Sequence, residues 1–512
     1  MDTNIPIIDI FAGPGGLGEG FSAFKPENDS ARFKIKLSIE KDETAHQTLQ
    51  LRAFYRQFVG KMIPPEYYEH LRGAISRDAL FEKYECEAGV AKKEAWKATL
   101  GEDRELIKTR IAEAVQGASD WVLIGGPPCQ AYSLVGRSKM RGLSKWKYAR
   151  DKRHTLYKEY LRILADHQPT IFVMENVKGL LSSRRVQKQK TFELIINDLK
   201  RPLGVDRKGS DEPLQYKLFS VSKRRVNASD ELKSEDFVVR SEEYGIPQAR
   251  HRIFILGIRS DKYKAEPEIL EKIERQVPIE SVIGDLPKLR SGLSKEADSA
   301  EKWRDAVKSI TKAGRLKSVD QSLRKAIVSA AKKLRGNLER GAVFSPQLIV
   351  APQKYSEWYV DNALSGICNH ETRSHIKEDL HRYFFAAVFA QVNKKSPTLN
   401  DFPKRLLPDH ENVEEALLDS KFNDRFRVQV RGRPSKTVVS HISKDGHYYI
   451  HYDPAQCRSL TVREAARLQT FPDNYFFEGN RTQQYHQVGN AVPPLLANKI
   501  AEVVYKVLKN VR

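Results

Sequence analysis

The amino-acid sequence predicts an α/β fold built on an open sheet, and three observations support this prediction. Short apolar runs of strand length recur in the first half of the chain, separated by helix-forming segments. The first run ends in a glycine-rich turn that leads into a helix-like segment, as in nucleotide-binding α/β units. Other runs end in polar or reactive side chains, and open α/β sheets place their chemistry at strand ends. We therefore expect a functional crevice along one edge of the sheet.

The length and composition limit the class of protein. The chain has 512 residues, of which 40% are hydrophobic, so it is long enough for two domains with real cores. Asp2, Pro6 and Asp9 interrupt the first eleven residues, and no stretch approaches about 18 uninterrupted apolar residues, which argues against export and membrane insertion. The four cysteines are far apart and form no CxxC pair, which disfavours disulfides and a zinc site. We expect a cytoplasmic protein without a metal.

The charge points to a polyanionic partner. The formal net charge is +21, and lysine and arginine side chains that bind phosphates release condensed counterions. Basic residues are dense in residues 137–153, 183–225 and 302–340. In the last of these stretches, apolar residues recur at near-helical spacing, which predicts amphipathic helices with basic outer faces. A single basic face is usually only solvated, but the overall balance favours nucleic acid as the partner.

The first two predicted strands indicate a nucleotide-type site. Residues 4–10 form an apolar run, and the turn after it contains glycines that would let the backbone approach a ligand closely. The second run, residues 33–39, ends at Glu40, where such sites place the carboxylate that holds ribose hydroxyls. The glycine spacing departs from GxGxxG, which favours an adenosine-bearing ligand without a pyrophosphate. Residues 42–118 read as helices on the outer face of the sheet, broken at Pro64, with no chemistry of their own.

Cys129 has the position of a nucleophile. The apolar run of residues 121–124 ends in two glycines and two prolines, and the thiol follows directly. The prolines would fix the chain direction and hold the thiol at a rigid strand end. A lone cysteine after an apolar strand is more often a small buried hydrophobic residue. Whether Cys129 is a nucleophile therefore depends on what the rest of the sequence indicates.

Further reactive side chains follow two other predicted strands. A helix over residues 156–167 leads to a strand over residues 170–174, which is followed by Glu175 and Asn176. Gln248, Arg250 and Arg252 precede the strand over residues 253–258, and strand alternation places these three side chains on one face. Two guanidinium groups pointing together suit a polarised carbonyl or a phosphate, although a basic edge strand and a solvated glutamate are the simpler interpretations.

The C-terminal part carries a capped helix and a closing helix. Thr461 and Glu464 form a capping-box pattern at the start of a helix predicted over residues 460–475. A closing helix over residues 495–508 is expected to pack on the first domain. Residues 436–443 and 447–452, around Lys444-Asp445-Gly446, predict a hairpin. The segment with Cys368, His370 and His375 reads as an ordinary polar turn rather than a metal site.

Six segments occur in a recognisable order: FAGPGG, GGPPCQ, ENV, PQARHR, REAARLQTFPDNY and QVGNAVPP. Together they resemble the signature blocks of the cytosine-5 DNA methyltransferases, over roughly residues 1–182, 241–259 and 435–512. The resemblance implies a Rossmann-like S-adenosylmethionine-dependent methyltransferase domain with a mixed, mainly parallel sheet, plus a smaller DNA target-recognition domain. We expect the catalytic domain in residues 1–259, completed by residues 486–512, and target recognition, with the connecting hairpin and helix, in residues 260–485.

The family chemistry implied by this resemblance gives each reactive residue a role. A thiolate adds to carbon 6 of a flipped-out cytosine, carbon 5 then takes a methyl group, and loss of the carbon 5 proton and the thiolate releases 5-methylcytosine. By the match, Cys129 is the nucleophile, and Glu175 holds ring nitrogen 3 and favours its protonation. Arg250 and Arg252 orient the site and hold the 2-carbonyl oxygen, while Asn176 organises the loop. Water is expected as the base.

The resemblance also implies the binding residues. Phe11 would stack on the adenine of S-adenosylmethionine and Glu40 would bind its ribose. The rest of that pocket is expected from Gly13, Gly16, Leu17, Pro128, Leu156, Asn490 and Val492. The acidic residue that contacts the adenine amino group is Asp103 or Asp120. Expected contacts to double-stranded DNA are Gln130, Ser133, Arg137 and Gln248.

This interpretation predicts a monomeric prokaryotic modification enzyme, cytoplasmic and nucleoid-associated, with a cognate restriction endonuclease acting separately. A tRNA cytosine-5 methyltransferase is an alternative with the same catalytic set, although it would not need so large an insert. A non-catalytic DNA-binding relative is another, against which the intact Cys129, Glu175 and arginines count. The glycine spacing opposes a nicotinamide dehydrogenase, which would also leave Cys129 without a function.

Overall fold

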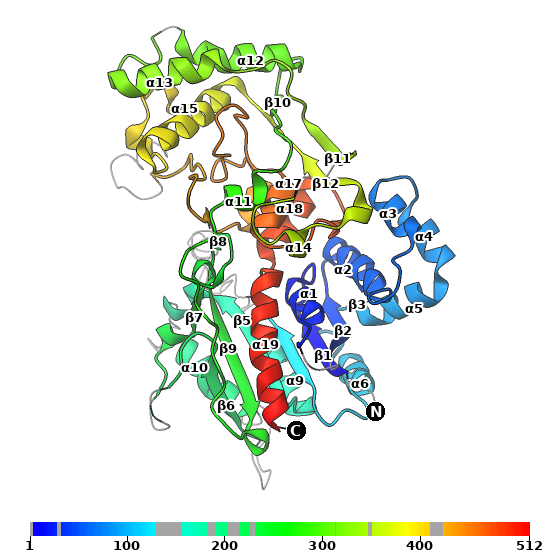
Figure 1. Ribbon diagram of the computed structural model, residues 1–512. Coiled ribbons are helices and arrows are strands. Elements are labelled where there is room, and N and C mark those ends of the chain that lie inside the picture. Colours follow the sequence, from blue (N-terminus) through cyan, green and yellow to red (C-terminus); the bar gives the residue numbers. More distant parts are fainter. Residues whose placement is uncertain are drawn as a thin grey trace.

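The computed structural model describes residues 4–27, 32–128, 156–182, 191–202, 214–225, 227, 231–312, 314–346, 351–409 and 423–511. Within these ranges, strands and helices alternate through the first half of the chain, and a largely helical lobe lies at the opposite end of the molecule from the sheet (Figure 1). None of the described helices has the length and apolar character needed to cross a membrane.

The described strands of the first domain form one twisted sheet in the order β3-β2-β1-β4-β5-β9-β6, with β7 also beside β9. Five of them are parallel: β3 (Ala95–Lys97), β2 (Phe33–Glu40), β1 (Ile5–Ile10), β4 (Val122–Gly125) and β5 (Ile171–Val177). β9 (His251–Arg259) runs antiparallel to β5, β6 (Tyr216–Ser220) and β7 (Val238–Arg240). This confirms the predicted mixed, mainly parallel sheet.

Helices cover both faces of the sheet, which explains why β1 and β4 are buried at every position. Ile5 and Ile7 of β1 pack on one face with α1 (Gly16–Ala23) and α19 (Pro494–Val511). Ile8 and Ile10 alternate to the other face. That face is covered by α6 (Arg104–Ala114), α9 (Leu156–His167) and α10 (Thr191–Lys200). The last helix, red in Figure 1, lies along the sheet beside α1, as expected for a closing helix.

Four helices between β2 and β3 form a side unit, seen on the right of Figure 1. They are α2 (Glu43–Arg56), α3 (Pro65–Leu71), α4 (Arg77–Lys83) and α5 (Glu85–Glu94). Pro65 occupies the first turn of α3, where its missing N–H costs nothing, so the predicted break is confirmed. Cys368 and Leu364 pack into the apolar core of this unit, so the inserted region, residues 260–434, contacts the helices beside the sheet here.

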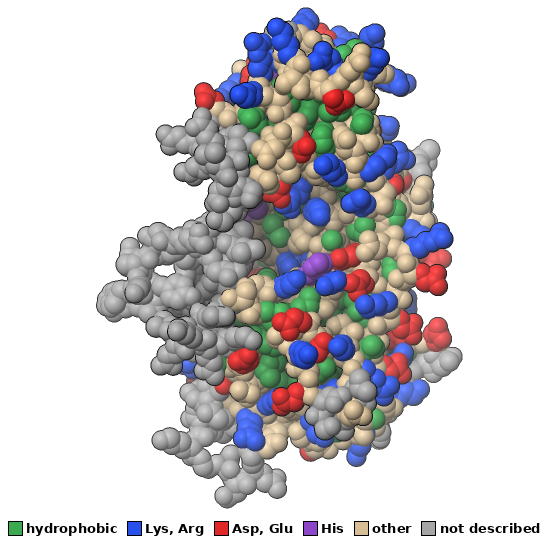
Figure 2. Space-filling view, turned by 90° about the vertical axis from the view of Figure 1, so that its left-hand side faces the viewer, with side chains coloured by type: hydrophobic (Ala, Val, Ile, Leu, Met, Phe, Trp, Pro, Cys, Tyr) green, Lys and Arg blue, Asp and Glu red, His purple; other side chains and the backbone are tan. Residues whose placement is uncertain are grey.

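The helical lobe contains α12 (Ala300–Lys308), α13 (Gln321–Lys332) and α15 (Lys377–Asn393). Trp303 and Ile327 are fully buried in its core against Phe384. The exposed faces of α12 and α13 carry many lysines and arginines, which confirms the predicted amphipathic helices. Lys and Arg side chains gather over the upper part of the molecule in Figure 2.

A middle layer lies between the lobe and the sheet. It contains α11 (Glu280–Ile283), α14 (Ser356–Tyr359), α17 (Val462–Leu468) and α18 (Arg481–Asn490), which share one apolar cluster. Three short strand pairs accompany it: β10 (Gly292–Leu293) with β13 (Ser374–His375), β11 (Gly341–Pro346) with β12 (Gly366–Glu371), and β14 (Ser435–Lys436) with β8 (Gln248–Ala249).

Three local predictions need correction. No hairpin forms around Gly446, because β14 pairs in parallel with β8 and residues Ser440–Ser443 form a 3-10 helix instead. The segment from Cys368 to His375 is not a polar turn but belongs to two strands, β12 and β13, of which β12 is mostly buried. His370 of β12 bonds Thr461 Oγ1 at 2.9 Å and the carbonyl of Pro287 at 3.1 Å. The helix that begins after the capping-box residue Thr461 is real but ends at Leu468.

Gly20 allows α1 and α19 to approach closely, and this predicts a specific stability loss. A Cβ at Gly20 would lie 2.6 Å from the backbone nitrogen of Asn498 and against Pro494 and Ala497. We expect Gly20→Ala to destabilise the protein by about 1–3 kcal/mol in urea unfolding, because the packed helices must separate. Gly89→Ala in α5 is the control, since no described atom lies within 4 Å of its Cβ. The control should be neutral or gain up to about 1 kcal/mol from helix propensity. A neutral Gly20→Ala would contradict the prediction.

Candidate active site

The functional residues meet at the carboxyl ends of β1, β4 and β5. Phe11 follows β1, Gly126 follows β4, and Glu175 lies near the end of β5. β9 runs antiparallel beside β5, with Val177 opposite Arg252, so Arg252 enters the same edge from a neighbouring strand. Cys129, Gln130, Ser133 and Arg137 lie outside the described residues.

Glu175 and Arg252 form a buried ion pair. Arg252 Nε lies 3.1 Å from Glu175 Oε1, and the two side chains are 13% and 14% exposed. Burial raises the pKa of the Glu175 carboxyl, and the guanidinium groups of Arg252 and Arg250 oppose this shift only in part. A Cβ at Gly126 would lie 2.7 Å from Glu175 Oε2, so the carboxyl group lies directly against the chain where it leaves β4. The carboxyl group therefore lies beside the segment that leads to Cys129.

Asn176 holds that segment. Its Nδ2 donates to the carbonyl of Pro127 at 3.3 Å, and its Oδ1 accepts from the backbone N–H of Val177 at 2.7 Å. One side chain thus joins the end of β5 to the loop after β4. This is the position that a loop-organising residue requires.

Arg250 and Gln248 have different surroundings from Arg252. Arg250 is 2% exposed, and its Nη1 donates to the carbonyls of Val438 at 2.7 Å and Gly489 at 3.4 Å. Gln248 is fully buried, and its amide donates to the Leu468 carbonyl at 3.0 Å and accepts from the Val438 N–H at 2.7 Å. Gln248 is therefore not available to DNA here, contrary to the expectation. From strand alternation we predict that Gln248, Arg250 and Arg252 share one face. Alternation does not reveal that residues 435–438 cover part of that face.

The glycine turn after β1 is fastened by Glu40. Gly13 N–H donates to Glu40 Oε2 at 2.7 Å, and Glu40 Oε1 accepts from the N–H groups of Lys41 and Asp42 at 2.9 and 2.8 Å. Gly13 has φ +57°, and no described atom lies within 4 Å of the position of a Cβ there. An open face over Gly13, the ring of Phe11 at the strand end and a carboxylate that can accept further hydrogen bonds together fit an adenosine ligand.

The last signature segment closes this turn from the other side. A Cβ at Gly16 would overlap the carbonyl of Val492, so the two segments are in direct contact. Gln469 Nε2 donates to the Val488 carbonyl at 2.7 Å, which holds the segment in place. Of the other expected pocket residues, Asn490 is exposed, Leu156 and Pro128 are half-buried, and Leu17 lies in the core under α1.

The topology separates the two acidic candidates for the adenine amino group. Asp120 precedes β4, so it lies at the opposite edge of the sheet, where its Oδ1 accepts from Thr170 Oγ1 at 2.9 Å and pairs with Lys262 Nζ at 3.1 Å. Asp103 follows β3, whose end pairs with Glu40. Asp103 is therefore the remaining candidate.

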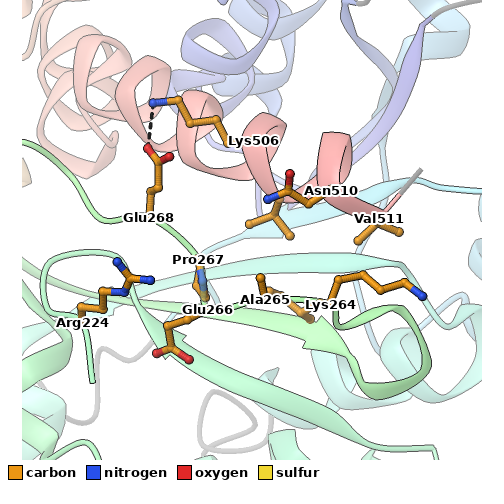
Figure 3. A pocket seen from close by; sticks show the side chains of 11 residues that line it. Arg224, Lys264, Ala265, Glu266, Pro267, Glu268, Lys506, Asn510 and Val511 are labelled. Carbon is orange, nitrogen blue, oxygen red and sulfur yellow. Dashed lines mark hydrogen bonds and ion pairs between the residues drawn. The ribbon is translucent and has the colours of Figure 1, made fainter. Parts of the chain in front are cut away.

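A hollow of about 200 Å³ lies away from this edge (Figure 3). It is lined by Ile258 of β9 and by the last turns of α19, with Lys506 bonded to Glu268 at 2.9 Å. Because Ile258 pairs with Ile171, at the start of β5, this hollow is at the opposite end of the sheet from Glu175.

The strand order and the glycine turn define a Rossmann-like methyltransferase fold. A model of the C-5 cytosine-specific DNA methylase family matches residues 94–203 and 233–506. The type II methyltransferase M.Bpa9945I of Bacillus paralicheniformis is 32% identical, covering 98% of this chain and 99% of the relative. M.DdeI of Desulfomicrobium norvegicum, also a type II methyltransferase, is 25% identical, covering 99% of this chain and 89% of the relative. The DNA (cytosine-5-)-methyltransferase M.ApeKI of Aeropyrum pernix is 28% identical, covering 77% of this chain and 83% of the relative.

This protein therefore belongs to the C-5 cytosine-specific DNA methylase family, and the resemblance predicted from its motifs is confirmed.

Asp9, near the end of β1, was not singled out from the sequence. It is 1% exposed, and burial raises the pKa of its carboxyl group to about 8, with Arg56 opposing and Glu40 adding to the shift. The folded protein thus holds a proton on Asp9 that the unfolded chain releases at lower pH.

This shift predicts that the contribution of Asp9 to the free energy of unfolding falls as pH rises from about 4 to about 8. Asn cannot ionise, so the melting temperature of Asp9→Asn should exceed that of the wild type by a margin that grows between about pH 5 and pH 8.5. Asp103→Asn, at an exposed position, is the control and should follow the wild type. Parallel curves for Asp9→Asn and wild type would contradict the prediction.

Proposed function

We propose that this protein transfers a methyl group from S-adenosylmethionine to carbon 5 of a flipped-out cytosine in double-stranded DNA, with Cys129 as the nucleophile. The observation that carries the proposal is the buried Glu175–Arg252 pair, 3.1 Å apart, beside the segment Gly126–Pro127–Pro128 that leads to Cys129. Cys129 itself enters from the sequence and from family membership.

Cys129, Glu175 and Arg252 each have a separate role in the proposed reaction. The Cys129 thiolate adds to carbon 6, and the ring electrons move toward nitrogen 3. Glu175, whose raised pKa favours its protonated form, donates to that nitrogen, while Arg252 holds the carboxyl group and the 2-carbonyl oxygen. S-adenosylmethionine supplies an electrophilic methyl group to carbon 5. Water then removes the carbon 5 proton and the thiolate leaves, while nitrogen 3 returns its proton to Glu175, which restores the aromatic ring.

For the methyl donor, we propose that Phe11 stacks on adenine and that Glu40 holds the ribose hydroxyls. The open face over Gly13 and the contact between Gly16 and Val492 support a pocket at this turn. Asp103 is the proposed partner of the adenine amino group. Arg250 acts as a positioning residue, because its bonds to Val438 and Gly489 orient the strand that carries Arg252.

For the DNA, we propose that residues 260–485 supply target recognition. The net charge of +21 and the basic faces of α12 and α13 support phosphate contacts. Ser133, Arg137 and Gln130 belong to the proposed catalytic loop that reaches the DNA. The similarity to type II methyltransferases supports a modification enzyme. We propose that it acts as a monomer and that a cognate restriction endonuclease acts separately.

The direct test supplies the purified protein with S-adenosylmethionine and either duplex DNA or tRNA, and maps 5-methylcytosine by bisulfite sequencing. We expect methylation of DNA at one short sequence, lost in Cys129→Ala. Methylation that survives Cys129→Ala would reject the mechanism, methylation of tRNA alone would establish the alternative substrate, and no methylation of either would favour a non-catalytic relative.

Glu175→Gln tests the role of the carboxyl group. An amide cannot transfer a proton to ring nitrogen 3, so we expect the single-turnover rate to fall by about 10²- to 10⁴-fold. The Kd for DNA should change little. The matched control is Glu242→Gln, because the Glu242 carboxylate pairs with His251 at 2.8 Å rather than with Arg252. Equal rates for Glu175→Gln and the control would contradict the assignment.

A further inference from the structure

The glycine turn between β1 and α1 is held by a tyrosine from the far end of the chain. The hydroxyl of Tyr475, which is fully buried, donates to the carbonyl of Pro14. A Cβ at Gly15 would lie 3.0 Å from that hydroxyl and 2.8 Å from Leu49 Cδ1, so the ring is packed against the turn itself. The two bonded residues are 461 positions apart in the sequence.

Arg52 joins this tyrosine to helix α1. Its Nε and Nη2 donate to the two carboxylate oxygens of Glu19 at 2.9 and 2.5 Å, and Glu19 lies in the first turn of α1. The same guanidinium lies 4.9 Å from the centroid of the Tyr475 ring and donates to Asn474 Oδ1 at 3.0 Å. A buried bidentate pair has a fixed geometry, so residues 474 and 475 are rigidly connected to α1.

Asn474, the neighbour of Tyr475, also contacts the inserted region. Asn474 Nδ2 donates to Asp361 Oδ2 at 2.7 Å, and that oxygen also accepts from the hydroxyl of Tyr68 at 2.8 Å. Tyr475 therefore sits on a support that is fixed to α1, to α3 and to the inserted region at once.

A turn made of Gly-Pro-Gly-Gly has almost no side chains with which to fix its own position, and glycine loses more conformational freedom on ordering than any other residue. Its backbone must be held from outside. Glu40 holds the N–H of Gly13, and Tyr475 holds the carbonyl of the next residue, Pro14. Preorganising a ligand-binding loop lowers the cost of binding, so a lost contact should appear as lower affinity.

We propose that Tyr475 is a positioning residue for the methyl donor, which fixes the Pro14–Gly15 turn and thereby the donor-facing backbone of Gly13 and Gly16. The inference rests on the proposed function, because it takes this turn as the donor site. Burial raises the pKa of Tyr475, so its hydroxyl stays a donor throughout the neutral range. Tyr475 touches neither the reacting atoms nor the donor in this assignment; it acts through the turn.

Tyr475→Phe is the test, because it removes one hydroxyl and keeps the ring beneath Arg52. We expect the Kd for S-adenosylmethionine, measured by isothermal titration on the full chain, to rise about 5- to 20-fold, as for a lost buried hydrogen bond. The KM for the donor should rise similarly, while kcat at saturating donor and the Kd for DNA stay within about twofold.

Tyr485→Phe is the matched control. Its ring is equally buried and its hydroxyl donates to a backbone carbonyl, that of Leu460, at 2.6 Å, but in α18 rather than at the turn. Its donor Kd should equal that of the wild type. Wild-type donor binding by Tyr475→Phe, or equal weakening in both variants, would overturn the inference and leave the proposed function intact. Failure of the wild type to bind the donor at all would overturn both.

Discussion

The architecture depends on a contact that only glycine permits, between Gly16 at the start of α1 and the carbonyl of Val492 near the end of the chain. Gly20 repeats the close approach one turn later against Pro494 and Ala497. Helices α1 and α19 are thereby joined on one face of the sheet. The glycine turn after β1 is therefore incomplete until the last signature segment has docked, because Val492 lies directly against Gly16.

A buried polar network connects the last signature segment to the strand that carries Arg252. Gln469 donates to the carbonyl of Val488 and accepts from Gln248 at 3.0 Å, while Arg250 donates to the carbonyls of Val438 and Gly489. Gln248 and Arg250 both lie just before β9, which begins at His251. This network therefore orients the strand that presents Arg252 to Glu175. Because interior hydrogen bonds are strong and unpaired polar groups are costly, such a network favours one geometry over its neighbours.

The segment around α17 buries several charges, and each arginine has matched partners. Arg458 binds both oxygens of Glu464 at 2.7 and 2.6 Å, and Arg467 binds Asp473 and Asp285 at 2.7–2.8 Å. Desolvating such pairs offsets much of their attraction, so they contribute less to net stability than to orientation. Asp285 belongs to the inserted region, and Asp473 directly precedes Asn474 and Tyr475, which lie beside the glycine turn after β1. Arg467 of α17 therefore connects the two.

The sequence by itself determined the strands, their polar ends and the capped start of α17, because apolar runs, glycine and proline breaks and the Thr461–Glu464 box act over a few residues. The order of six motifs also determined the family. Only the tertiary structure decided which of Gln248, Arg250 and Arg252 reaches Glu175, since the partners that bury the first two lie 188–239 residues away. Residues 436–443 are likewise predicted as one arm of a hairpin, whereas Ser435 and Lys436 pair with β8 instead. The hydrogen bond of Tyr475 to the glycine turn after β1 is a contact across 461 residues, which no local pattern specifies.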